Sequence, residues 1–129
     1  GWSNAKTLND LSITKDGTDE SLVITKKSGS VSSEAAKISP IFENAKKMFS
    51  GVISENTTVQ ITDDLSASYM SIYIPAVKTD DAGNPVPGYV GYFFFEKAGN
   101  TYSCTIEGRR NITENLDEFT DILATINFR

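Results

Sequence analysis

Histidine is absent from this chain of 129 residues, and cysteine occurs only once. Without an imidazole the protein has no Ser-His-Asp triad, no Cys-His pair and no histidine ligand for a metal. A structural zinc site is excluded as well, because one thiol cannot supply four soft or borderline ligands. Catalysis would have to depend on carboxylates, lysine, tyrosine or the thiol of Cys104. The composition therefore favours a protein with no catalytic residues, no metal and no cofactor.

Long apolar runs and an excess of positive charge are also missing. No apolar stretch approaches the roughly twenty residues that a membrane-spanning helix needs. Lys and Arg number 12 against 17 Asp and Glu, so the net charge is -5. The basic residues are scattered, whereas binding to phosphates requires a basic surface. We therefore expect no nucleic-acid partner.

The chain begins with Gly1-Trp2-Ser3 rather than with Met. We expect that an upstream segment has been removed, and a signal peptide or a lipoprotein leader is one candidate for it. Abundant Ser, Thr and Asn also suit an exported protein. These features predict an extracytoplasmic protein, periplasmic or at the cell surface, which touches a membrane only through a lost lipid anchor.

A single domain is expected over residues 8–129, after a loose lead-in at 1–7, because the chain has the size and the 39% hydrophobic content of one globular core. Alternation and turn residues predict strands, and a 3.6-residue apolar period predicts helices. Pro40 interrupts the first helical pattern, so we expect a short lead helix and then a main helix over 40–50, with Ser39 as its cap. In chain order, the expected elements are strands 8–14 and 21–27, helix 33–50, strands 57–62, 67–77, 88–96 and 101–109, and helix 115–125.

The strand at 67–77 carries large side chains on both faces. Met70, Ile72 and Ile74 point one way, while Tyr69 and Tyr73 point the other. A sheet with only one buried face would carry polar residues on its second side. We therefore predict an α+β fold in which helices cover both faces of an antiparallel sheet, in the order β-β-α-β-β-β-β-α.

That order, together with two segments of sequence, resembles the Mog1/PsbP-like family, including its DcrB-like branch of uncharacterised bacterial lipoproteins. The segments are the acidic-aromatic stretch 114–128 and the strand-turn-strand stretch 92–102. The resemblance implies an α/β/α sandwich and a role in binding or assembly, such as support of a photosynthetic complex or binding of a small GTPase. The long loop at 78–88 does not match the family, and no residue matches a catalytic site.

Aromatic residues gather on the predicted sheet. They are suited either to a binding platform or to a core beneath the two helices. The set comprises Tyr69, Tyr73, Tyr89, Tyr92, Phe93, Phe94 and Phe95. Cys104 shares its strand face with Tyr102 and Ile106, and such apolar neighbours favour an inert buried thiol over a nucleophile.

Three polar clusters have similar alternatives. Asp80, Asp81 and Asn84 combine oxygen ligands with a glycine, as a calcium loop does, but they also suit an ordinary turn. Arg109 and Arg110 end a strand, where they would clamp an anionic ligand or pair with Glu107. The acids of the last helix fit a solvated face near a helix N-terminus better than a catalytic pair. Those acids are Glu114, Asp117, Glu118 and Asp121.

Two functions follow from this reading. The first is a non-catalytic, extracytoplasmic binding or assembly module for a protein or small-molecule partner. The second is a small-ligand carrier or enzyme that uses a cleft between sheet and helix, like a cystatin or a nuclear-transport-factor cone. A deep pocket with convergent polar groups favours the second, and a packed sheet with an exposed apolar rim favours the first. The candidate binding residues are Tyr69, Tyr73, Asp80, Asp81, Asn84, Tyr92 and Arg109.

Overall fold

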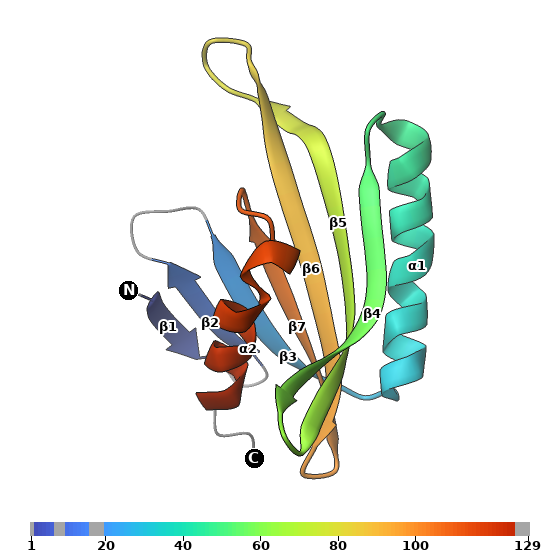
Figure 1. Ribbon diagram of the computed structural model, residues 1–129, viewed down its shortest axis with the longest axis vertical. Coiled ribbons are helices and arrows are strands. Elements are labelled where there is room, and N and C mark those ends of the chain that lie inside the picture. The colour runs from blue at the N-terminus through green and yellow to red at the C-terminus, as the bar shows by residue number, and fades with distance from the viewer. Residues whose placement is uncertain (1, 7–9, 16–19, 126–129) are drawn as a thin grey trace.

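One antiparallel sheet with a helix on each face forms the protein, as the computed structural model shows for residues 2–6, 10–15 and 20–125 (Figure 1). The seven strands lie in the order β1-β2-β3-β7-β6-β5-β4. The elements are β1 (Trp2–Lys6), β2 (Asp10–Lys15), β3 (Ser21–Lys27), α1 (Val31–Met48), β4 (Ile53–Thr62), β5 (Leu65–Thr79), β6 (Pro85–Lys97), β7 (Asn100–Gly108), the 3-10 turn η1 (Thr113–Asn115) and α2 (Leu116–Thr125). The predicted α+β class with an antiparallel sheet and two helices is confirmed.

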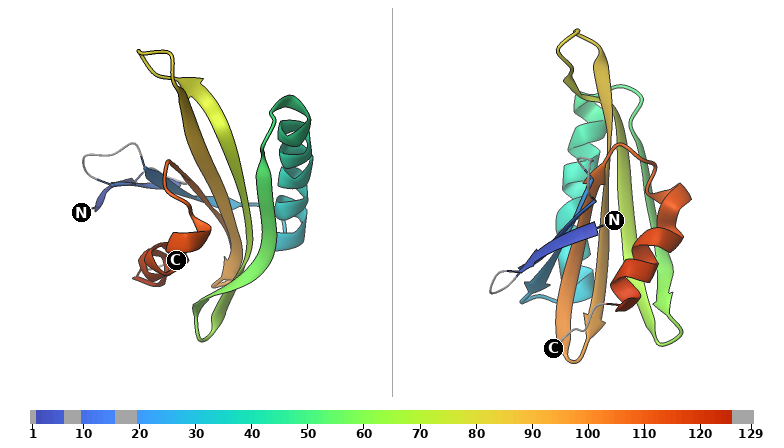
Figure 2. Two further views of the ribbon diagram at one scale, coloured as in Figure 1. Left: turned by 45° about the horizontal axis from the view of Figure 1, so that its top comes forward. Right: turned by 90° about the vertical axis from the view of Figure 1, so that its left-hand side faces the viewer.

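The two faces of β5 are used as predicted. Met70 and Ile72 belong to the smaller core beneath α1, and Tyr69 belongs to the larger core beneath α2. Figure 2 shows that the sheet curves around α2, whereas α1 lies along its outer side. We call the side that holds α2 the concave face. The residues of the larger core come from six elements of the sheet and from the chain after β7, and its fully buried aromatic side chains are Tyr69, Phe93, Phe95 and Phe119.

A strand occupies part of the segment where we expected a lead-in without regular structure. Trp2 to Lys6 form β1, which pairs antiparallel with β2 from Trp2 opposite Lys15 to Lys6 opposite Leu11. The segment has no alternation of apolar and polar residues. Its strand conformation therefore comes from hydrogen bonding to the edge of β2, which a local pattern does not encode.

The first helix is continuous, so the predicted interruption at Pro40 is wrong. Ser30 caps the helix by accepting a hydrogen bond from the Ser33 backbone at 3.1 Å, and the helix ends at Met48. Pro40 removes the hydrogen bond to the carbonyl of Ala36, and both residues are exposed to solvent. Water can satisfy that carbonyl, so the apolar face of the helix packs on the sheet without a break.

The β5–β6 hairpin is longer than predicted, and the expected loop at 78–88 shrinks to 80–84. The pairing continues past a bulge, because Ile74 lies opposite Gly88 and Lys78 lies opposite Val86. Pro85 and Pro87 lie beyond Tyr89, where the pairing of β6 with β7 ends. A proline is tolerated in a strand where no neighbour needs its missing N–H. The hairpin therefore projects from the sheet as an arm (Figure 1).

Candidate functional site

A row of large side chains crosses three strands on the concave face. Ile53 pairs with Tyr73, and Tyr73 pairs with Tyr89, so the three residues lie side by side in register. The two tyrosine rings are 4.7 Å apart between centroids at an angle of 34°. Both tyrosines are half-buried, and Ile53 is 63% exposed. We call Ile53, Tyr73 and Tyr89 the tyrosine row.

Next to the tyrosine row, the start of η1 lies on the concave face of the sheet. Tyr69 is fully buried, and its hydroxyl lies 3.0 Å from the Thr113 hydroxyl. The Thr113 hydroxyl donates in turn to the Glu55 carboxylate, so Tyr69 donates to Thr113. Burial raises the pKa of the Tyr69 hydroxyl above its usual value. This chain of hydrogen bonds ties η1 to β4 and β5, and η1 packs there while the tyrosine row stays partly open.

Gly91 makes the close approach of η1 possible. A side-chain carbon at this position would lie 3.0 Å from Ile112 and 3.5 Å from the Tyr69 ring. Ile112 is 1% exposed and belongs to the core beneath α2. Because Gly91 has no side chain, Ile112 can pack closely on β6. This contact positions the segment that leads into α2, the helix on the concave face.

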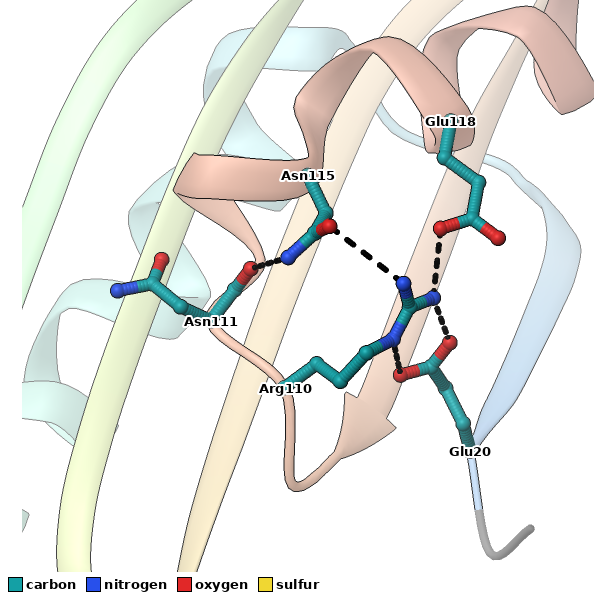
Figure 3. A network of polar contacts seen from close by, with 5 residues as sticks. All are labelled: Glu20, Arg110, Asn111, Asn115 and Glu118. Atoms are coloured by element: carbon teal, nitrogen blue, oxygen red, sulfur yellow. Dashed lines mark hydrogen bonds and ion pairs between the residues drawn. The ribbon is translucent and has the colours of Figure 1, made fainter.

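An ion-pair network joins Glu20 to the segment 110–118, which lies 90 positions further along the chain (Figure 3). The Arg110 guanidinium donates to Glu20 through Nε at 2.9 Å and also through Nη2. Nη2 lies 2.7 Å from the Glu118 carboxylate, and Nη1 donates to Asn115 at 3.4 Å. Glu20 precedes β3 and is 4% exposed. Arg110 therefore holds the start of α2 against the start of β3.

The chemistry of this network is structural. Hydrogen bonding to Glu20 raises the pKa of the Arg110 guanidinium, and the guanidinium carbon also lies 5.8 Å from the centre of the Phe119 ring. Glu20 lies over Gly108, where an added side-chain carbon would meet the Glu20 Cγ at 3.1 Å. Within the described residues, every buried side-chain nitrogen or oxygen has a hydrogen-bond partner. A carboxylate whose charge is already met by an arginine is a poor general acid or base.

The predicted site residues lie in four separate places. Tyr69 and Tyr73 are on the concave face, while Tyr92 lies beneath α1, with its ring 6.0 Å from that of Phe42. Burial also raises the pKa of the Tyr92 hydroxyl. Arg109 is exposed after β7, and the loop residues are at the tip of the arm. The structure thus groups the two tyrosines on the concave face and the three loop residues in one turn, and it keeps these two groups, Tyr92 and Arg109 apart.

The acidic loop at the tip of the arm is used as a turn. One oxygen of Asp80 accepts hydrogen bonds from the backbone of Ala82 at 3.0 Å and of Asn84 at 2.8 Å. The backbone of Gly83 has a positive φ of 84° and donates to the Asp80 carbonyl. Asp80, Asp81 and Asn84 are all exposed. In the part of the chain that the structure describes, no group of three or more Asp, Glu or Cys side chains is placed to hold a metal ion.

A polar hollow of about 970 Å³ lies beside the N-terminus of α1, open to solvent. Its buried carboxylate, Glu34, accepts a hydrogen bond from Lys37 at 3.1 Å. The carboxylate occupies the first turn of α1, where the backbone N–H groups favour a negative charge. The lining residues are Thr25, Lys26, Lys27, Ser28, Gly29, Glu34, Lys37, Gly99, Asn100 and Thr101.

Sequence reasoning missed two parts of this region. Ile53 fell in an expected connection before the strand at 57–62, although it begins β4. Glu20 lies between the predicted strands 8–14 and 21–27, and its partner Arg110 is 90 positions away. No local pattern reports such a pair. The predicted burial of Cys104 is confirmed, since its side chain is fully buried, and burial raises the pKa of its thiol well above the usual value.

Comparison with known proteins adds no relative. No protein-family profile matches this sequence, and no curated protein is significantly similar to it. Over the described ranges, no helix combines the length and the apolar character that crossing a bilayer requires.

Proposed function

We propose that this protein is a non-catalytic binding or assembly module of Mog1/PsbP-like architecture that acts outside the cytoplasm. The observation that carries the proposal is the tyrosine row, where two half-buried tyrosine rings in tilted contact and an exposed isoleucine lie side by side across β4, β5 and β6. Exposed aromatic and aliphatic side chains on a rigid sheet are typical of recognition surfaces.

The surroundings of the tyrosine row support a binding surface. The pairing of Tyr89 with Gly108 brings the row to the Glu20–Arg110 network, which supplies a polar rim. The arm continues from the row through Pro75 and Pro87 to the exposed turn at 80–84. A hydrophobic centre with a polar rim is the usual anatomy of a protein-binding surface. The partner we propose is therefore a protein rather than a nucleic acid, in keeping with the net charge of -5.

The ligand-carrier or enzyme alternative has less support. It requires a deep pocket in which several polar groups converge and can still form hydrogen bonds to a ligand. The hollow beside α1 is open, and its buried carboxylate is paired with Lys37. The pattern of elements supports the proposed Mog1/PsbP-like architecture, and the abundance of Ser, Thr and Asn supports the proposed location outside the cytoplasm.

Site-specific photocrosslinking tests the binding surface. A benzophenone amino acid is placed at Tyr73, at Tyr89 or, as the control, at the exposed Asn44 on α1. After irradiation of cells that produce the protein, we expect the same adduct from positions 73 and 89 and none from position 44. Adducts of equal yield from all three positions, or none at 73 and 89, would contradict the proposal.

Two further measurements complete the test. Tyr73→Ser should abolish the adduct formed from position 89, and Tyr89→Ser should abolish the adduct formed from position 73. Both variants should keep a cooperative thermal transition, because these side chains are only half-buried. Fractionation of the producing cells should place the full-length protein outside the cytoplasm. Recovery in the cytoplasmic fraction would overturn the proposed compartment without affecting the binding surface.

A further inference from the structure

We propose that the outer edge of β4 pairs antiparallel with the same edge of a second copy, with Asn56 on the two-fold axis, to form a homodimer with one continuous sheet. The proposal goes beyond the binding function, because it concerns the backbone edge of β4 and a different partner; it shares only Ile53 with the tyrosine row. It rests on the position of β4, on what its edge lacks and on how the strand matches itself.

β4 is the last strand of the sheet. Its inner edge pairs with β5 without interruption from Ile53 opposite Tyr73 to Gln60 opposite Ser66. Among the described residues, no strand pairs with its other edge. That edge therefore presents a row of backbone N–H and C=O groups that are able to bind another strand.

The usual protections of an edge strand are missing over 53–60. The stretch contains no proline, lysine or arginine, and its only charge is Glu55, whose carboxylate accepts a hydrogen bond from Thr113. Natural edges are commonly blocked by charges, prolines or bulges. The first irregularity in β4 comes between Gln60 and Thr62, so it limits the straight part of the strand without blocking it.

The straight part of β4 is complementary to itself. In an antiparallel pair, residues opposite each other lie on the same face. With Asn56 on the axis, Ile53 faces Val59 of the second copy, Glu55 faces Thr57 and Ser54 faces Thr58. Apolar residues thus meet at both ends, polar residues meet between them, and no like charges are opposed.

The pairing also gives a contact to the Ile53 side chain, which is 63% exposed on the concave face of the single chain. Val59 is half-buried against the core beneath α2. A β-branched pair of this kind stabilises adjacent strands. Seven residues on each copy take part, from Ile53 to Val59, and the pairing stops before the irregularity at Gln60. Because of the two-fold symmetry, a dimer contains the Ile53–Val59 pair twice. We therefore assign a second copy of the chain as the partner of this edge.

Symmetric disulfides test the register. Opposite Cα atoms in an antiparallel pair are about 4.5 or 5.5 Å apart, within the range of a disulfide. Asn56→Cys should therefore form a crosslinked dimer on oxidation. Thr57→Cys is the matched control, because residues 57 of the two copies would lie roughly 8 Å apart, beyond that range. The native Cys104 is fully buried and does not interfere.

A charge exchange at the axis tests the same geometry without a covalent bond. Asn56→Lys and Asn56→Asp each place like charges opposite each other, which should raise the dimer dissociation constant about fivefold. An equal mixture of the two variants should form a heterodimer, as measured by analytical ultracentrifugation at low salt. Asn44→Lys on α1 is the control and should leave the dissociation constant unchanged.

The proposal predicts a dimer of the unmodified chain, a disulfide at position 56 and recovery of the dimer in the mixture. A protein that is monomeric at millimolar concentration overturns it. Equal crosslinking at positions 56 and 57, or a dimer that neither charge variant weakens, also overturns it. None of these results depends on Tyr73 or Tyr89, so failure here leaves the proposed binding surface standing.

Discussion

At the scale of single residues, three hydroxyl or thiol groups are held neutral by burial. The pKa values of Cys104, Tyr69 and Tyr92 are all raised, in each case first of all by loss of solvent. The usual values are 9.0 for the thiol and 10.0 for the phenols. The neutral forms pack in a core or donate hydrogen bonds, whereas the ionised forms would be buried charges.

This arrangement predicts a loss of stability in alkali. A group whose pKa is raised by folding stabilises the folded state fully below its unfolded-state pKa, and that contribution declines as the pH rises above it. The contribution of these three groups to the free energy of unfolding should therefore be constant up to a pH of about 9 and fall above it. Urea titrations across this range measure the effect. In Cys104→Ala the decline should begin at higher pH, and an unchanged onset would contradict the assignment to the thiol.

Arg110 is predicted to be the most important surface charge for stability. Arg110→Ala removes both hydrogen bonds that the buried Glu20 carboxylate accepts from the guanidinium, which should cost about 2 kcal/mol after allowance for the partial exposure of the arginine. Arg109→Ala, at the exposed neighbouring arginine, should cost less than about 1 kcal/mol. Chemical denaturation measures both values. Adding Glu20→Gln to Arg110→Ala should recover part of the loss, and equal costs at the two arginines would refute the role of the network.

At the scale of elements, α1 keeps a proline in its interior because only the exposed side is affected. Pro40 should still cost stability, since it removes one hydrogen bond and crowds the preceding turn. Pro40→Ala should stabilise the protein by about 1–2 kcal/mol, after part of the gain is offset by the greater freedom of the unfolded chain. The urea midpoint and the helical circular dichroism report the change. A lower midpoint would show that the proline is needed for the packing of α1.

The helical segment that leads into α2 is capped by the side chain of Asn111. The sequence predicts a helix that begins at 115, but the helix is preceded by η1, and the Asn111 side chain accepts the hydrogen bond of the Glu114 backbone at 3.0 Å. The Asn115 side chain instead donates to the Asn111 carbonyl at 2.7 Å and accepts from Arg110. Ile112 lies against Gly91 directly before η1, so the residue that caps this segment is Asn111, four positions before Asn115.

At the scale of the whole molecule, the order of the strands predicts a gradient of local stability. β6 contributes to the cores on both faces, and β7 lies beside it in the middle of the sheet, whereas β1 lies at one edge and β4 at the other. Amide hydrogen exchange should be slowest in β6 and β7 and fastest in β1, with rates that differ by about a hundredfold or more. Exchange measured by mass spectrometry resolves these segments. Equal protection of β1 and β7 would contradict the gradient.

The sequence by itself determined the layers of this protein. Alternation in β5, with Met70 and Ile72 on one side and Tyr69 on the other, already required a cover on each face, and the periodic apolar residues of two helices provided it. These signals are local, since each depends on a spacing of a few residues, and burial on a face enforces them. The buried state of Cys104 followed from its neighbours for the same reason.

Only the tertiary structure decided which distant residues meet. The strand at Trp2–Lys6, the continuity of α1 through Pro40 and the pairing of Glu20 with Arg110 each depend on a partner far along the chain or on the side that faces solvent. The tyrosine row and the open edge of β4 arise in the same way, from strand register and strand order. Register is set by the sum of many contacts across the sheet, and no short stretch of sequence contains that sum.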